Sequence, residues 1–157
     1  MIEFHELSGP PSAQDIERLN QVFPEGIPRE FRLFIEEHDG AYEPECLVDP
    51  MRIQKIPGGD LYGLQLYTIP EIFEAREIYE GRVSPDLVPV GFDSFGNQFC
   101  LGRMGLRYGK VIFWDHEDDV AGCLSIGIPT DADRIHKNEY PIADSFEVFL
   151  DLLILAE

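Results

Sequence analysis

Cysteine is scarce in this sequence and follows no ligand or disulfide pattern. Three cysteines, Cys46, Cys100 and Cys123, occur in 157 residues, and none belongs to a Cys-x-x-Cys pair. An odd number at wide spacing argues against a disulfide framework and against a cysteine-rich zinc site. Each thiol stands in an apolar or strand-like stretch, where free cysteine behaves as a small hydrophobic residue. We therefore expect a protein of a reducing, cytoplasmic compartment.

Long apolar runs are also missing. No stretch of about 18 apolar residues occurs, so we expect no membrane-spanning helix. The opening residues, MIEFHELSGPPS, have neither a basic start nor an apolar centre, so we expect no secretory signal. The chain is still 44% hydrophobic and 11% aromatic, which is enough for a packed core. Its length predicts one domain, residues 1–157, that needs neither a disulfide nor a metal to hold a core.

Basic residues are few, and acidic residues outnumber them: 12 Lys and Arg against 30 Asp and Glu give a net charge of −18. The excess lies at the two ends, because residues 1–51 hold twelve acids and three bases, and residues 110–157 hold eleven and three. Phosphate contacts require Lys and Arg, so we expect no binding to nucleic acid or to an anionic membrane. A basic protein partner suits such a charge, and solubility alone is the alternative explanation.

Motifs for catalysis are absent as well. The sequence has no Gly-x-Ser-x-Gly elbow, no Walker loop and no Gly-x-Gly-x-x-Gly. A nucleophilic Cys100 paired with one of the four histidines has no local support. Thirty acids make carboxylate pairs inevitable, so such pairs carry no information about glycosidase chemistry. We expect no enzyme activity, no catalytic residues and no cofactor.

Apolar periodicity outlines the fold. Helices are expected after a Ser12 cap, over residues 27–40, after a capping box at Thr68 and Glu71, and over residues 144–157. Short strands are expected in the ranges 41–67, 87–93, 97–102, 110–115 and 123–129. Helices flanking strands that connect by hairpins predict an α+β fold, with a mixed or mainly antiparallel sheet of about six strands and helices packed on one face.

The stretch VIFWDHEDD, residues 111–119, is the densest group of ionisable side chains. On a strand, His116 and Asp118 share a face and could bind an ion together with His136, but so short a match arises often by chance. The segment EDDVAG does not keep the alternating positions of a calcium loop. We expect no metal site here. We interpret Val111 to Trp114 as sheet core and Asp115 to Asp119 as a solvated turn at the end of that strand. The alternative is that Asp115 to Asp119 form an acidic surface that faces a partner.

Four ordered motifs resemble the SUKH superfamily of cell-wall-synthesis regulators and bacterial immunity proteins. They are IPREFRLFIEEHDG, LVPVGFDSFGNQFCL, YGKVIFWDHED and SFEVFLDLL. The resemblance implies an α+β domain without catalytic residues. It also implies binding to a protein partner, and for the bacterial immunity proteins that partner is a toxin, often a nuclease. A regulatory or scaffold role unrelated to toxins is the alternative.

An immunity protein of this composition would bind a basic toxin domain through acidic side chains. One group of expected contacts is Glu36, Glu37, Asp39, Glu43 and Glu45, and the other is Asp115, Glu117, Asp118 and Asp119. Tyr42 and Tyr62 are expected as aromatic anchors. If the fold brings the two acidic groups together they form one surface, and if it separates them a single interface can use only one. The sequence defines neither the partner nor the oligomeric state.

Overall fold

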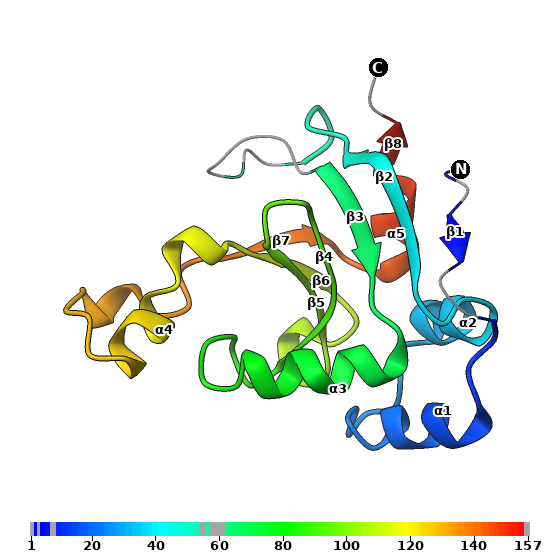
Figure 1. The fold of residues 1–157 in the computed structure, drawn as a ribbon, viewed down its shortest axis with the longest axis horizontal. Helices are drawn as coiled ribbons and strands as arrows, with labels where there is room; N and C mark the ends of the chain where they lie inside the picture. The colour runs from blue at the N-terminus through cyan, green and yellow to red at the C-terminus, as the bar shows by residue number, and fades with distance from the viewer. Residues whose placement is uncertain (1, 3, 7–8, 54–55, 57–61, 156–157) are drawn as a thin grey trace.

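The computed structural model of the chain describes residues 2, 4–6, 9–53, 56 and 62–155, and every structural statement below concerns these residues. It is an α+β domain built on one eight-stranded sheet (Figure 1). The strands are β1 (His5–Glu6), β2 (Ala41–Val48), β3 (Tyr62–Leu66), β4 (Leu87–Phe92), β5 (Gln98–Gly102), β6 (Val111–Trp114), β7 (Glu139–Ala143) and β8 (Leu153–Leu155). Their order is β1-β2-β3-β4-β5-β6-β7, with β8 also paired to β2, and every pairing between strands is antiparallel. The expected fold class is confirmed.

Most helices begin at a residue whose side chain caps them, and the helix that follows Pro28 is the exception. They are α1 (Ala13–Asn20), α2 (Arg29–Glu37), α3 (Ile69–Ile78), α4 (Val120–Ser125) and α5 (Phe146–Asp151), with 3-10 turns η1 (Gly105–Arg107), η2 (His116–Asp118) and η3 (Ala132–Arg134). The Ser12 side chain accepts a hydrogen bond from the Asp15 amide at 3.1 Å, and Thr68 and Glu71 form the predicted capping box. None of these helices is long and apolar enough to cross a bilayer.

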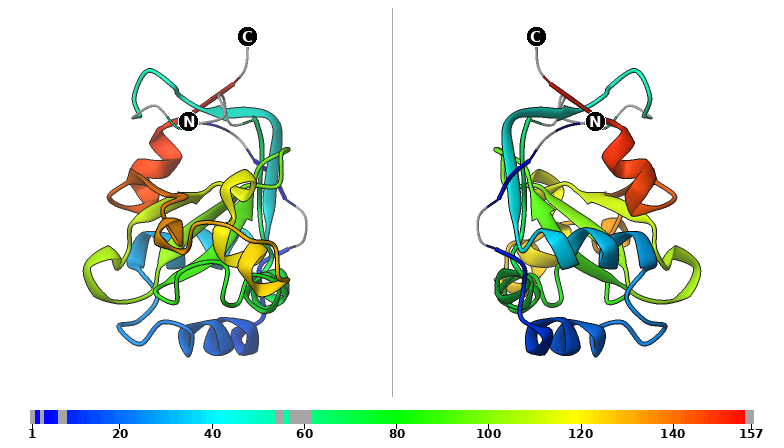
Figure 2. Two further views of the ribbon diagram at one scale, coloured as in Figure 1. Left: turned by 90° about the vertical axis from the view of Figure 1, so that its left-hand side faces the viewer. Right: turned by 90° about the vertical axis from the view of Figure 1, so that its right-hand side faces the viewer.

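The main core lies between one face of the sheet and helices α1, α2 and α5, together with the first turn of α3. Strand residues such as Val88, Phe99 and Phe113 point into it because side chains alternate between the two faces of a strand. Phe31 of α2 packs edge-on against Phe146 of α5, with ring centroids 5.0 Å apart. Figure 2 shows these two helices on the same side of the curved sheet. Helices α2 and α5 therefore cover this face of the sheet together.

A smaller apolar cluster occupies the opposite face of the sheet. Leu87, Cys100, Ile112 and Trp114 point into it, and Tyr79, at the end of α3, packs against it. The prediction that Val111 to Trp114 form sheet core is confirmed, since all four residues are buried. Strand β6 is thus covered on both faces, which explains its continuous apolar sequence.

Several segments differ from the sequence expectation, among them residues 139–143, which form β7 where no strand was expected. Residues 123–129 do not form a strand, because the Asp119 carboxylate accepts a hydrogen bond from the Gly122 amide at 2.9 Å and begins α4. The closing helix ends at Asp151, and Leu153–Leu155 leaves it to pair with β2. Leu153 is buried there. Strands β1 and β8 are too short to show a periodic pattern, so the sheet has eight strands where about six were expected.

Candidate functional site

The first acidic group lies where α2 runs into β2. The Glu37 side chain is 80% exposed, and Glu36 accepts a hydrogen bond from Arg32 Nε at 3.0 Å. The Asp39 carboxylate accepts from the backbone amide of Ile69 at 2.8 Å, so it caps the start of α3. Glu45 is exposed on β2. The side chains of Tyr42, Glu43 and Tyr62 lie outside the described part of the structure.

The second acidic group is mostly committed to internal contacts. Asp115 is buried, and its carboxylate accepts from the Glu117 amide at 3.0 Å. Asp118 accepts from Arg134 Nη2 at 2.6 Å, and the Asp119 side chain is 11% exposed and accepts from Arg82 Nε at 2.7 Å. Glu117 alone in this group is exposed. The expected solvated turn after the strand is therefore corrected in part: a 3-10 turn is present and Glu117 is exposed, but Asp115, Asp118 and Asp119 are partly or fully buried.

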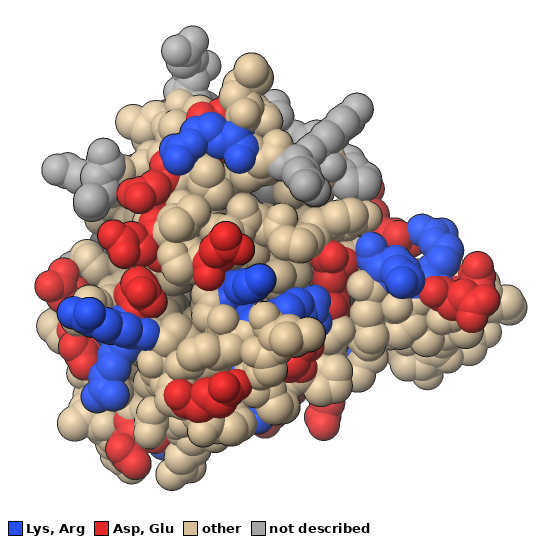
Figure 3. All heavy atoms as spheres, turned by 180° about the vertical axis from the view of Figure 1, so that it is seen from behind, with Lys and Arg blue, Asp and Glu red and all other residues tan. Residues whose placement is uncertain are grey.

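The two acidic groups do not share one surface. Strands β2 and β6 are four positions apart in the sheet, a separation of roughly 19 Å at the usual strand spacing. The segment that follows β6 projects from one side of the molecule, whereas α2 lies at the opposite side (Figure 1). On the face shown in Figure 3, acidic side chains occur in separate groups with basic ones between them. A single interface can use only one of the two predicted groups.

Arg82 covers the buried tryptophan at the end of β6. Its guanidinium lies 4.9 Å from the ring centroid of Tyr79 and 5.6 Å from that of Trp114, and it also pairs with Asp119. The two rings meet edge-on at 5.2 Å. Trp114 is fully buried beneath the Tyr79 ring and the Arg82 guanidinium. Its indole therefore packs the core and is closed to a ligand.

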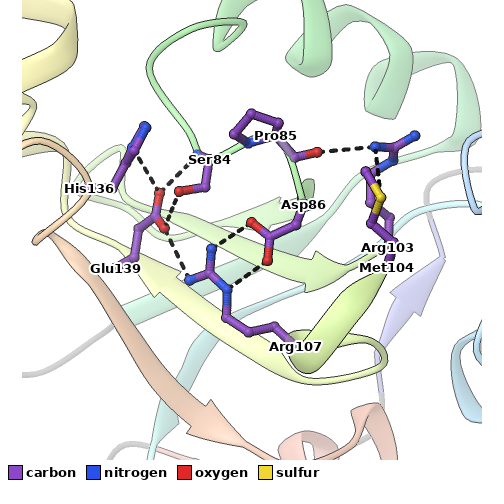
Figure 4. A network of polar contacts seen from close by, with 8 residues as sticks. All are labelled: Ser84, Pro85, Asp86, Arg103, Met104, Arg107, His136 and Glu139. Atoms are coloured by element: carbon purple, nitrogen blue, oxygen red, sulfur yellow. Dashed lines mark hydrogen bonds and ion pairs between the residues drawn. The ribbon is translucent and has the colours of Figure 1, made fainter.

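A buried carboxylate, Glu139 on β7, gathers a polar network that sequence reasoning missed (Figure 4). The side chain is 2% exposed and accepts from the Ser84 hydroxyl at 2.6 Å and the Ser84 amide at 2.9 Å. Arg107 donates to it from Nη1 at 3.1 Å and holds Asp86 with two further hydrogen bonds, at 2.8 Å and 2.6 Å. These partners are 32 to 55 positions from Glu139 in the chain, so no spacing rule finds them.

Histidine and cysteine near this network are poorly placed for chemistry. His136 has a φ of 63°, and its Nδ1 lies 3.4 Å from Glu139 Oε2 without the alignment of a hydrogen bond. Within the described residues, no group of three or more His, Cys, Asp or Glu side chains is arranged to hold a metal. Cys100 is fully buried, and burial followed by the charge of Glu139 raises the pKa of its thiol well above the usual value. A thiol in that state is a weak nucleophile.

The Asp86–Arg107 pair predicts a loss of stability in acid. The hydrogen bond from Arg107 lowers the pKa of the Asp86 carboxyl despite partial burial. A folded-state pKa below the unfolded value, about 3.9 for Asp, gives stability that is present above that pH and is lost as pH falls through the folded pKa. Asp86→Asn should therefore cost about 1 kcal/mol at pH 7, because the pair is partly solvent-screened, and less below pH ~4. Urea unfolding at several pH values measures this difference.

Asp144→Asn is the matched control for that experiment. Its side chain is 91% exposed and lies 4.0 Å from Lys110, at the outer limit of an ion pair. Its effect on stability should therefore be small at every pH. A cost of Asp86→Asn that stays constant from pH 7 to strongly acidic conditions would contradict the assigned role of Arg107.

Comparison with known proteins places the chain in a family. The chain matches the model of the SMI1 / KNR4 family (SUKH-1) over residues 10–152. It is also similar to the "SPbeta prophage-derived uncharacterized protein YokK" of Bacillus subtilis (strain 168), with 31% identity over 81 residues, 52% of this chain and 33% of that protein. The match thus spans about a third of the length of this curated relative, whose name assigns no activity.

Proposed function

Because this chain belongs to the SMI1 / KNR4 (SUKH-1) family, we propose that it is a non-enzymatic binding module, an immunity protein that neutralises a basic, nuclease-type toxin in the cytoplasm. The observation that carries the proposal is the charge: 30 acidic against 12 basic residues in a chain that folds as a domain of this family. A nuclease is basic where it meets nucleic acid, and an acidic inhibitor can cover that surface.

We assign the interface to the α2–β2 side of the molecule. Glu37 is 80% exposed and Glu36 is 43% exposed, so both carboxylates can face a partner. In the second group, Asp115, Asp118 and Asp119 support the turn and α4 through internal hydrogen bonds. A partner that recruited those three would have to compete with existing contacts. The exposure of Glu36 and Glu37 therefore supports the first group as the interface. We include Tyr42, Glu43 and Tyr62 in this proposed interface because they belong to the adjoining strands β2 and β3.

Charge reversal at one residue of each group separates the two surfaces. Glu37→Lys should slow association with the toxin domain by about fivefold at low salt and weaken its salt dependence, because exposed interface charges mainly set the rate of encounter. Glu117→Lys changes the same charge on the opposite side and should alter the rate by less than about twofold. Stopped-flow or surface-based kinetics at several salt concentrations measures both variants.

The reverse result would move the interface to the other end of the sheet. If Glu117→Lys slowed association and Glu37→Lys did not, the turn after β6 would be the contact surface. Equal, small effects at both residues would remove both acidic groups from the interface.

Affinity capture tests the proposal as a whole. The full chain, tagged, should co-purify with a basic toxin domain of a large secreted protein, if a neighbouring reading frame encodes one. No complex with that domain, in a cell where the chain is folded and expressed, would favour the regulatory or scaffold role.

A further inference from the structure

A cavity of about 680 Å³ lies between α1, α3 and the face of β4 that points away from the main core. This volume falls within the range of roughly 300–1,000 Å³ that is usual for small-molecule sites. The lining includes Arg18, Phe73, Arg76, Tyr79, Pro89 and Arg103. Neither of the acidic groups expected from the sequence contributes to it. The residues that line the cavity are therefore different from those of the acidic surface proposed for the toxin.

Three arginines line this one cavity in a chain that has only 12 basic residues. Arg103 is fixed by neutral acceptors, donating to the Val22 carbonyl at 2.8 Å and the Pro85 carbonyl at 3.2 Å, and the second contact is visible in Figure 4. Because neither acceptor is a carboxylate, the charge of Arg103 is not neutralised by them. Arg18 lies over the Phe73 ring at 4.4 Å and is 3.9 Å from Asp15.

Arg76 is the cation with the least local compensation. No hydrogen bond or ion pair to its guanidinium is found among the described residues, and burial together with the charge of Arg103 lowers its pKa. Glu80 acts in the opposite direction but more weakly. Two guanidinium groups that repel each other beside a cavity would be stabilised by an anion placed between them.

The rest of the lining restricts what that anion can be. Phe73, Leu87 and Pro89 supply an apolar wall. Glu77 and Glu80 also line the cavity, so a ligand with many negative charges along its length, such as a nucleic acid, is repelled. A planar guanidinium matches a carboxylate with two parallel hydrogen bonds.

We propose that the cavity binds an organic carboxylate with an apolar body, its carboxylate between Arg76 and Arg103 and its body on the Phe73 side. An apolar carboxylic acid and the C-terminus of a peptide share this chemistry. The site is separate from the acidic surface assigned to the toxin, so its failure would leave the immunity proposal unchanged.

Amide chemical-shift titration of the full chain tests the site with two probes, 4-phenylbutyrate and N-acetylleucylphenylalanine. At least one acid should shift amides that line the cavity, and the C-terminal amide of the dipeptide should bind about tenfold more weakly than its acid. Binding of the dipeptide alone would identify a peptide terminus as the ligand, and binding of 4-phenylbutyrate alone would identify a small acid.

Arg76→Gln should raise the Kd of the bound acid by about tenfold, whereas Arg29→Gln, which removes an exposed charge on α2, should change it by less than about twofold. Arg18→Gln, also exposed, provides a second test if Arg76→Gln does not fold, with an expected loss of about threefold. The proposal is overturned if neither acid shifts these amides at about 10 mM, if acid and amide bind equally, or if the Arg76→Gln and Arg29→Gln variants behave alike.

Discussion

Replacing Glu139 with alanine is expected to lower the free energy of unfolding by about 3 kcal/mol. The carboxylate is 2% exposed and accepts hydrogen bonds from both the amide and the hydroxyl of Ser84. Its removal leaves these buried donors without an acceptor and takes one of two carboxylates from Arg107. Urea unfolding at neutral pH measures the loss.

Two further variants distinguish the stability cost of losing the Glu139 hydrogen bonds from the cost of removing any acidic side chain. Glu139→Gln keeps one acceptor oxygen for Ser84 but loses the charge that faces Arg107, so it should cost roughly half as much. Glu74→Ala removes an exposed acid from α3 and should change stability by less than about 0.5 kcal/mol. If Glu139→Ala were as mild as Glu74→Ala, the network would not contribute to the fold.

Replacing Gly102 with alanine is expected to cost about 3 kcal/mol or to prevent folding. A β-carbon at this position would lie 1.7 Å from the carbonyl oxygen of Arg107. The two backbones are held together by hydrogen bonds from the Gly102 amide to the Lys110 carbonyl at 2.9 Å and from the Gly109 amide to the Gly102 carbonyl at 3.0 Å. Because the obstacle is backbone, rotation of a side chain cannot relieve the clash.

Gly9→Ala is the matched control, since a β-carbon there meets nothing within 4 Å. It should leave the midpoint of thermal unfolding close to that of the wild type. A Gly102→Ala protein with wild-type stability would show that the loop of residues 103–109 does not pack against β5 as described. A large loss would also displace Arg107, so the amides around Glu139 should shift in any folded fraction.

The parts of the fold that depend on neighbouring residues could be predicted from the sequence. The Ser12 cap and the Thr68–Glu71 capping box are contacts over three positions. Alternation and apolar runs identified β4, β5 and β6, because buried strands select for apolar side chains over a few consecutive residues. The four ordered motifs then indicated the family.

Contacts between distant segments could not be predicted in this way. Glu139 meets Ser84 and Arg107 across 55 and 32 positions, and Arg18, Arg76 and Arg103 line one cavity from three separate segments of the chain. Strand β8 forms because β2 offers it a partner, while its own sequence continues a helical pattern. One local signal was available and was missed: Asp119 stands three residues before Gly122, the spacing of a helix cap.

Growth rescue tests the proposed immunity function most directly. If a neighbouring reading frame encodes a toxin domain, cells that express that domain should die, and co-expression of the intact chain should restore growth. Glu37→Lys, which alters the accessible acidic surface, should rescue less well than wild type at equal protein levels, whereas Glu117→Lys should rescue fully. Death of the cells despite abundant folded chain would contradict the immunity function, whatever the chain binds.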